Sequence, residues 1–236
     1  MIKFKRFAIF SLIIRSVILI VNFSYLLSQS IVTDILRDES DNILSIEYFN
    51  TSFNNIQLIK IEYYYTNGQL DKIENYNNGL LDGPCLEYFN NGKIKREGQY
   101  KNGEQYGVWF TYFDNGNKES IYHANHLGKL NGSITQWFEN GEMKTKGNYL
   151  NDEKHGIWTY WFINGRKKRM VTYNSGNQEG IYIDYYPNGK TMKEGVIDYK
   201  GIKEERCFDE NELSIKCDDL ISNDKINNPS LKRENN

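Results

Sequence analysis

Proline, cysteine and histidine are scarce in this chain, with three of each among 236 residues. The low proline count is typical of β-strands, because proline cannot donate a hydrogen bond within a sheet. Cys85, Cys207 and Cys217 lack the spacing of a metal site. Cys207 and Cys217 would close a small loop if the chain is exported; the alternative is two unpaired thiols in a loose tail.

Charge of one sign is also lacking. The formal net charge is −2 and the pI is near 6.0, so there is no electrostatic reason to expect nucleic acid as a partner. Aromatic residues instead reach 14%, with 18 tyrosines, while the mean hydropathy is −0.68. This combination is typical of a thin, half-solvated sheet that carries amphipathic rings.

Motifs of catalysis are absent as well. The sequence has no Gly-x-Ser-x-Gly elbow, phosphate loop or His-Glu-x-x-His helix. His123 and His126 are close together, but no cysteine or third histidine accompanies them, so no metal is expected. The paired carboxylates at 204–205 and 218–219 are interpreted as solvated charge. We therefore predict no enzyme, with no catalytic, cofactor-binding or metal-binding residues.

Residues 1–28 have the pattern of a targeting segment. Lys3, Lys5 and Arg6 precede an apolar run at 7–27, and small residues follow it. The run is long enough to span a bilayer, although Arg15 would cost about 2.5–3.5 kcal/mol at its centre. Two interpretations remain open: a cleaved signal peptide or a retained membrane-anchor helix. Both predict a chain exported to, or anchored in, the bacterial cell envelope rather than the cytoplasm.

One short phrase recurs through the rest of the chain: two aromatic residues, a variable residue, then Asn-Gly. The glycines of this phrase are separated by 24, 24, 25, 24 and 24 residues. A fixed period of this length indicates a linear repeat array. The six repeat-defining turns are Asn67-Gly68, Asn91-Gly92, Asn115-Gly116, Asn140-Gly141, Asn164-Gly165 and Asn188-Gly189.

Each unit reads as a β-hairpin. The Asn-Gly pair predicts a type I′ turn, because both residues tolerate a positive φ. A second, wider turn would follow, with a strand opened by Gly83, Gly107, Gly132, Gly156 or Gly180. Turn geometry is the interpretation for every glycine. The one-residue insertion at 122–126 predicts a bulge or a longer loop.

The fold class that follows is all-β: an elongated, solenoid-like antiparallel sheet of consecutive hairpins, in about six 24-residue units. We expect about twelve strands spaced roughly 4.8 Å apart, with one face richer in stacked rings. The predicted domains are an amino-terminal cap at 29–58, the repeats at 59–203, a carboxyl-terminal cap at 204–217 and a disordered tail at 218–236. The caps would cover the sheet edges; an edge-to-edge homodimer is the alternative.

The segment Gly98-Gln99-Tyr100-Lys101-Asn102-Gly103-Glu104-Gln105-Tyr106-Gly107 resembles the MORN pattern, Gly-x-Tyr-x-x-Gly-x-x-x-Gly. With the added aromatic Asn-Gly phrase, the chain resembles the MORN-repeat variant of bacterial proteins that are often labelled antitoxin components. The resemblance covers about 145 residues. It implies an antiparallel repeat sheet, a binding or scaffold role, and no active-site residues.

Two groups of residues are candidates for an interaction surface. Tryptophans either pack the sheet or form a docking surface, and basic residues form either a solvated edge or a contact for an acidic partner or anionic lipid head groups. The leading hypothesis is a scaffold for an unidentified protein partner. The alternatives are a peripheral membrane module and an antitoxin-like binder. The candidate residues are Trp109, Trp137, Trp158, Trp161, Arg166, Lys167, Lys168 and Arg169.

Overall fold

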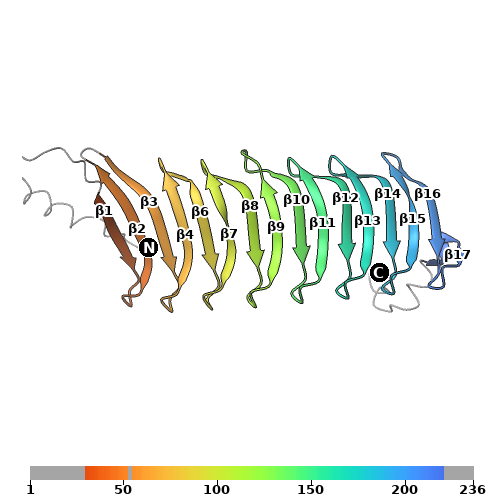
Figure 1. Cartoon of the computed structure of the whole chain (residues 1–236), viewed down its shortest axis with the longest axis horizontal. Helices are drawn as coiled ribbons and strands as arrows, with labels where there is room; N and C mark the ends of the chain where they lie inside the picture. Colours follow the sequence, from red (N-terminus) through yellow and green to blue (C-terminus); the bar gives the residue numbers. More distant parts are fainter. Residues whose placement is uncertain (1–29, 53–54, 221–236) are drawn as a thin grey trace, which may run out of the picture.

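The computed structural model describes residues 30–52 and 55–220, which form one long antiparallel sheet (Figure 1). Its seventeen strands are β1 (Ser30–Arg37), β2 (Ile43–Ser52), β3 (Asn55–Tyr64), β4 (Leu70–Asn77), β5 (Leu80–Leu81), β6 (Gly83–Tyr88), β7 (Ile94–Lys101), β8 (Glu104–Tyr112), β9 (Lys118–Ala124), β10 (Leu130–Trp137), β11 (Met143–Leu150), β12 (Glu153–Trp161), β13 (Lys167–Asn174), β14 (Asn177–Tyr185), β15 (Thr191–Asp198), β16 (Gly201–Phe208) and β17 (Ser214–Ile215).

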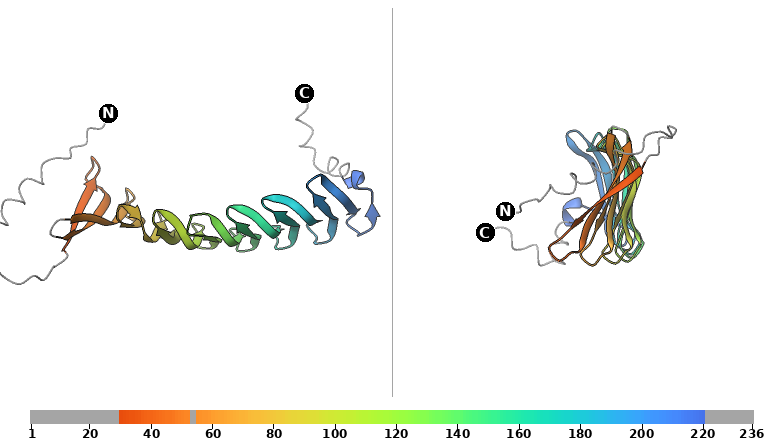
Figure 2. Two further views of the ribbon diagram at one scale, coloured as in Figure 1. Left: turned by 90° about the horizontal axis from the view of Figure 1, so that it is seen from above. Right: turned by 90° about the vertical axis from the view of Figure 1, so that its left-hand side faces the viewer.

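The strands follow a simple meander. Each long strand pairs with its neighbour in sequence, and β4 pairs with β6 as well as with the two-residue β5. Views from above and from the end show a single layer of curved strands (Figure 2). The prediction of an all-β sheet of consecutive hairpins is confirmed. The expected strand number is too low, because β1, β2, the short β5, β16 and β17 add to the expected twelve.

The predicted signal or anchor helix at 1–28 lies outside the described residues. Within residues 30–52 and 55–220, no helix is long and apolar enough to cross a membrane.

The predicted type I′ geometry of the Asn-Gly phrase is wrong. In the loop after β6, the N–H of Gly92 donates a hydrogen bond to the carbonyl oxygen of Phe89 at 2.8 Å. The N–H of Phe89 donates to the carbonyl oxygen of Lys93, also at 2.8 Å. Gly92 has a φ of 79°, whereas Asn91 has no positive φ. This pattern is a three-residue loop, a type I turn followed by a left-handed glycine. The variable residue before Asn-Gly lengthens the loop, and loop length selects the turn type.

The recurring asparagine has two roles in this loop. The Oδ1 atom of Asn91 accepts a hydrogen bond from the N–H of Lys93 at 3.0 Å, which holds the turn. Its Nδ2 atom donates to the carbonyl oxygen of Asp114 in the next turn along the sheet at 3.1 Å. The same inter-repeat bond recurs at Asn67, Asn115, Asn140 and Asn164. These amides therefore form a ladder along one long side of the sheet.

The opposite side of the sheet carries the tight turns. Residue pairs with two positive φ values lie there: Asn78-Gly79, Asn102-Gly103, Asn151-Asp152 and Ser175-Gly176. Two consecutive positive φ values define the type I′ turn. The turn that we expected to be the wider of the two is therefore a two-residue turn. At the insertion, Asn125 to Lys129 separate β9 from β10, which confirms the longer loop.

The expected strand-opening glycines lie within strands, except Gly83, which begins β6. Gly107 has a φ of 75° inside β8. The register passes from Glu97 opposite Phe110 to Gln99 opposite Tyr106, so three residues of β8 face Gly98 alone. This bulge bends the strand. The same shift recurs beside Gly132, Gly156 and Gly180.

The bulges make the two faces of the sheet unequal. Along β11 the side chains alternate: Thr145 and Gly147 are buried, whereas Lys144, Lys146 and Asn148 are exposed. We call the buried side the tryptophan face, because Trp109, Trp158 and Tyr182 lie on it, and the other side the open face. All close ring pairs in the described residues belong to the tryptophan face. The prediction that one side is richer in stacked rings is confirmed.

The two ends of the sheet also differ. β1 is exposed along its whole length. At the other end, β17 pairs with the last two residues of β16, and residues 217–220 form one helical turn. Cys207 and Cys217 form a disulfide across this end, with their Cα atoms 5.1 Å apart. The pairing of these cysteines, which the sequence left open, is therefore settled.

Candidate interaction surface

Trp109 is the most completely buried residue of the proposed surface. Its side chain has 0% exposure and lies in the bulge of β8 opposite Gly98. Tyr100 meets its ring edge-on with centroids 5.1 Å apart, and the Arg96 guanidinium lies 4.2 Å from the ring centre. An added Cβ on Gly98 would lie 2.3 Å from this ring. The glycine therefore makes room for the tryptophan, which corrects our interpretation of it as a turn residue.

Trp158 repeats this arrangement in β12, with 2% exposure. Tyr149 meets the ring edge-on at 5.0 Å, and Lys154 Nζ lies 4.4 Å from the ring centre. The indole Nε1 atom donates to the carbonyl oxygen of Asn148 at 3.1 Å. Burial removes both Trp109 and Trp158 from any surface that a partner could contact. The expectation that they form a docking surface is wrong, because the bulge turns each side chain onto the preceding strand.

The residue two positions before a bulge glycine helps to cover this face. Lys154 donates to the Tyr160 hydroxyl at 2.8 Å, and the Tyr122 hydroxyl donates to Gln105 at 3.2 Å. Gln178, in the corresponding position of β14, accepts a hydrogen bond from Arg169 at 3.0 Å. The start of each of these strands therefore folds over the rings, which explains how a single-layer sheet buries two tryptophans.

Trp137 and Trp161 lie on the open face. Each ends its strand three residues after a residue of the tryptophan face, Ile134 or Trp158, so alternation directs it to the opposite side. Both are half-buried. The four tryptophans therefore do not share one surface.

The basic run at 166–169 is divided as well. Arg166, Lys167 and Lys168 are exposed beside the loop between β12 and β13. Arg166 donates to the carbonyl oxygen of Pro187 in the next loop at 3.3 Å, and Lys168 Nζ lies 5.8 Å from the ring centre of Phe162. Arg169 is on the tryptophan face, where its Nε atom lies 3.6 Å from Asp184. The structure therefore leaves three of the four basic residues on one patch.

Asp184 is a buried carboxylate of the tryptophan face that lies among charged side chains of neighbouring strands. Burial raises the pKa of this carboxyl group, although Arg169 and Lys193 act in the opposite direction. The Lys193 Nζ atom lies 3.8 Å from Asp184 and 3.6 Å from Glu205. These charges contact one another across neighbouring strands, so they stabilise the sheet rather than offer a free binding site.

The open face carries an apolar patch that was not among the residues expected from the sequence. Ile157 and Ile181 are 59% and 63% exposed. They occupy the same repeat position, directly after a bulge glycine, in β12 and β14. Met170 lies on β13 between these strands and is paired with Ile183. We call this group the β12–β14 patch: Ile157, Trp161, Met170, Ile181, Ile183 and Tyr185.

The signal for this patch was present in the sequence as the residue that follows each bulge glycine. Position 108 is also aliphatic, whereas positions 84 and 133 are proline and serine. Val108 is 38% exposed on the open face. Two neighbouring outgoing strands with isoleucine at this position create the concentrated apolar surface.

On β2 and β3, near the amino-terminal end, the open face carries a polar cluster. Glu62 accepts hydrogen bonds from the hydroxyls of Tyr48 at 2.7 Å and Tyr64 at 2.9 Å. Lys60 Nζ lies 2.8 Å from Glu62 and 3.8 Å from the centre of the Tyr48 ring. Burial alone would raise the pKa of Glu62, but the hydrogen bonds from the lysine and the tyrosines outweigh it and hold this pKa below its usual value.

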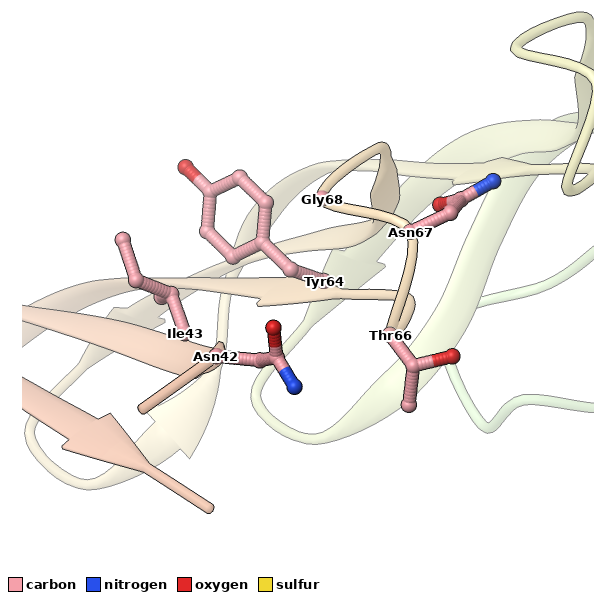
Figure 3. Close-up of a pocket in the computed structure, with 6 residues that line it drawn as sticks. All are labelled: Asn42, Ile43, Tyr64, Thr66, Asn67 and Gly68. Carbon is pink, nitrogen blue, oxygen red and sulfur yellow. The ribbon is translucent and has the colours of Figure 1, made fainter. Parts of the chain in front are cut away.

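A shallow depression of about 310 Å³ lies beside this cluster (Figure 3). Its lining comes from the start of β2 and from the end of β3 with the following loop. Of these residues only Tyr64 titrates, and burial, followed by the neighbouring Glu62, raises its pKa to about 12. The depression therefore offers no acid–base pair near neutral pH. The lining residues are Asn42, Ile43, Tyr64, Thr66, Asn67 and Gly68.

Two cysteine environments bear on metal binding and reactivity. Glu205 lies close to Cys207 and Cys217, but the two sulfur atoms are bonded to each other and therefore offer no thiolate. Burial raises the pKa of the free Cys85 thiol to about 11, and the nearby Glu87 and Glu74 add to the effect. Cys85 is therefore a packing residue of the tryptophan face rather than a nucleophile.

No curated protein matches the chain. A crystal structure of a protein of unknown function from Bacteroides fragilis NCTC 9343 is similar over 80% of this chain and 88% of that one, with 6% identity and a TM-score of 0.15.

The family described as MORN repeat variant matches four segments, at residues 59–78, 81–102, 130–151 and 178–197. The hairpins between them have the same turns, as Asn115-Gly116 and Asn164-Gly165 show. MORN repeats are generally protein- or membrane-binding modules and are typically non-catalytic. This chain is a protein that carries MORN variant repeats.

Proposed function

We propose that this chain is a non-catalytic scaffold that binds a protein partner through the β12–β14 patch of its open face. The observation that carries the proposal is the exposure of Ile157 and Ile181 at the same repeat position of β12 and β14, on either side of β13. Isolated exposed apolar residues are common, but neighbouring ones on a rigid surface mark interaction sites. The half-buried Trp161 and Tyr185 add the ring types that dominate binding energy at interfaces.

The geometry of the patch supports a protein partner. Strand pairing fixes the positions of Ile157, Met170 and Ile181, so little conformational freedom is lost when a partner binds. Polar residues flank them, because Lys144 and Lys146 are exposed on β11 and Glu194 lies on β15, where Val196 pairs with Ile181 and extends the apolar centre. An apolar centre with a polar rim is the usual anatomy of a protein–protein interface.

The test is cross-linked co-purification with the chain and two variants. Ile157→Lys combined with Ile181→Lys places charge at the centre of the patch, where we expect recovery of the partner to fall about tenfold or more. Ser133→Lys is the matched control, because Ser133 is exposed at the same repeat position in β10. A protein recovered equally well with all three chains would contradict the proposed surface. Circular dichroism shows whether each variant keeps its fold.

A second candidate function is attachment to an anionic membrane surface. The observation that favours it is the exposure of Arg166, Lys167 and Lys168 beside one loop. Each basic residue near such a surface contributes about 1 kcal/mol. Flotation of residues 29–236 with vesicles containing phosphatidylserine at low salt tests it. If the scaffold function is correct, the chain stays with the soluble fraction; flotation that Lys167→Glu and Lys168→Glu abolish would favour the membrane function. Antitoxin-like neutralisation of the partner would be a special case of protein binding.

We also propose that the protein acts in the cell envelope. The leader pattern of residues 1–28 motivates this location, and the Cys207–Cys217 disulfide supports it, because disulfides persist in oxidising compartments. Thiol labelling before and after reduction, on protein taken directly from cells, tests the idea. Labelling of Cys207 and Cys217 without reduction would place the protein in a reducing compartment.

A further inference from the structure

The first strand of the sheet has an unprotected edge. Among the described residues, β1 pairs with β2 alone and so on one side only, and every one of its eight residues is exposed. Four of them are aliphatic: Ile31, Val32, Ile35 and Leu36 are 65%, 52%, 45% and 53% exposed. The free side of such a strand presents backbone N–H and C=O groups that can pair with another strand. This edge is distinct from the β12–β14 patch, which lies toward the other end of the sheet, before β15, β16 and β17 (Figure 1).

The opposite edge of the sheet is protected. β17 occupies one end of the free side of β16, next to the Cys207–Cys217 disulfide. The rest of that strand carries Lys203, Glu204, Glu205 and Arg206, and charged side chains discourage edge pairing. Head-to-tail pairing of β1 with β16 is therefore disfavoured. A contact between two copies of β1 is instead related by a two-fold axis and closes on itself.

We propose that two copies of this chain associate through their β1 strands, in antiparallel register with Thr33 opposite Thr33 of the second copy. The result is one continuous sheet about twice as long, whose repeat arrays point away from a central β1 pair. The two β12–β14 patches then lie at opposite ends of the assembly, so that one dimer presents two distant copies of the proposed binding surface.

The residue pattern of β1 selects this register. A two-fold axis perpendicular to the sheet keeps each side chain on its own face, so opposite residues must share a face. With Thr33 on the axis, Ile31 of each copy lies opposite Ile35 of the other copy on the open face, which gives two such pairs. Shifting the register by one step in one direction places the two Asp34 carboxylates opposite each other, which is unfavourable, and shifting it in the other direction replaces both Ile31–Ile35 pairs by Ile31–Thr33 pairs. The aliphatic pairing and the charge therefore favour the same arrangement.

The size of the contact predicts a reversible dimer. Eight residues per copy are fewer than the roughly 20–30 per side of a standard interface. We therefore expect dissociation in the micromolar range, from about 1 to about 100 μM.

The first experiment is sedimentation equilibrium of the full-length chain in a non-ionic detergent, over that concentration range. Ile31→Lys with Ile35→Lys opposes like charges in the proposed register and should weaken the dimer about tenfold or more. Ile31→Lys with Ile35→Glu opposes unlike charges and should restore it. A chain that stays monomeric at about 100 μM, or a dimer that both variants leave unchanged, would overturn the proposal.

Cysteine cross-linking tests the register itself. Opposite Cα atoms of an antiparallel pair lie about 4.5–5.5 Å apart, within reach of a disulfide. Thr33→Cys should therefore form a covalent dimer under mild oxidation. Ile35→Cys is the matched control, since two copies of residue 35 would be offset by four residues, or about 13 Å along the strands. Equal cross-linking of both variants, or cross-linking of Thr33→Cys to a different protein, would contradict pairing between two copies.

Discussion

Gly147→Ala tests whether the glycines of the tryptophan face are there to admit a tryptophan. An added Cβ would lie 2.3 Å from Cδ2 and 2.4 Å from Cε2 of Trp158, closer than side-chain atoms can approach. Overpacking of this kind costs typically about 1–3 kcal/mol. Gly147 has no positive φ, so alanine would otherwise fit the strand and gain about 0.4–1 kcal/mol through the unfolded chain. We expect a net loss of about 2 kcal/mol in the free energy of unfolding.

A double-mutant cycle isolates the cause. In a Trp158→Ala background the clash is absent, so Gly147→Ala should become neutral or slightly stabilising, with a coupling energy of about 2–3 kcal/mol. The assay is urea unfolding followed by circular dichroism. If Trp158→Ala leaves too little folded protein, Trp158→Leu serves in its place. The Gly98 and Trp109 pair provides an independent second cycle.

The control is Gly141→Ala. Gly141 has a φ of 88° and no atom within 4 Å of an added Cβ, so its cost is backbone strain alone and should not depend on Trp158. The reasoning is refuted if Gly147→Ala costs the same with and without the tryptophan, or if it stabilises the parent chain.

Three further predictions concern individual hydrogen bonds, and the first two compare equivalent positions of the repeat. Trp158→Phe should cost about 1 kcal/mol more than Trp109→Phe in urea unfolding, because the Trp158 indole donates to Asn148 whereas the buried Trp109 Nε1 has no acceptor among the described residues; equal costs would contradict this. Asn140→Asp keeps the hydrogen bond within the turn but loses the one that the side-chain amide donates to the carbonyl oxygen of Ile163. It should therefore lower the free energy of unfolding by about 1 kcal/mol more than Asn188→Asp, because the described residues show only the bond to Lys190 for Asn188. The reverse order would count against the asparagine ladder. The pKa of Glu62 is lowered on folding, so its contribution to the free energy of unfolding is present above about pH 5 and is lost as the pH falls through the folded pKa. The urea midpoint of unfolding should therefore fall more steeply with acid in the parent chain than in Glu62→Gln. Parallel pH profiles of the two proteins would contradict this prediction.

The repeat order of the sheet could be predicted from the sequence, because the aromatic Asn-Gly phrase fixes both period and hairpin. The turn types were predicted on the wrong sides of the sheet: the type I′ turns lie opposite the aromatic Asn-Gly phrase, which itself forms three-residue loops. The Asn-Gly pair satisfies a type I′ turn in isolation, but the residue before it lengthens the loop. The asparagine amide also bonds to the next repeat, and a contact between residues 23 apart is not readable from a local pattern.

The candidate surface was harder to predict. Alternation shows that Trp158 and Trp161 face opposite sides, but it does not show which side is covered. Coverage comes from the bulges, which fold Lys154 over the ring, and bulges leave only a glycine as their signal. Large aromatic residues therefore drew attention to the buried face, while Ile157 and Ile181 form the exposed patch.

In the proposed function, the open face binds a partner while the tryptophan face holds the sheet together. Photo-cross-linking in cells tests it most directly, with a photoreactive residue placed at Ile181 and, as a control, at the exposed Pro84, which occupies the same repeat position in β6. We expect one discrete protein adduct from position 181 and none from position 84. Identical adducts from both positions, or no adduct from position 181 in cells where the protein is folded, would contradict it.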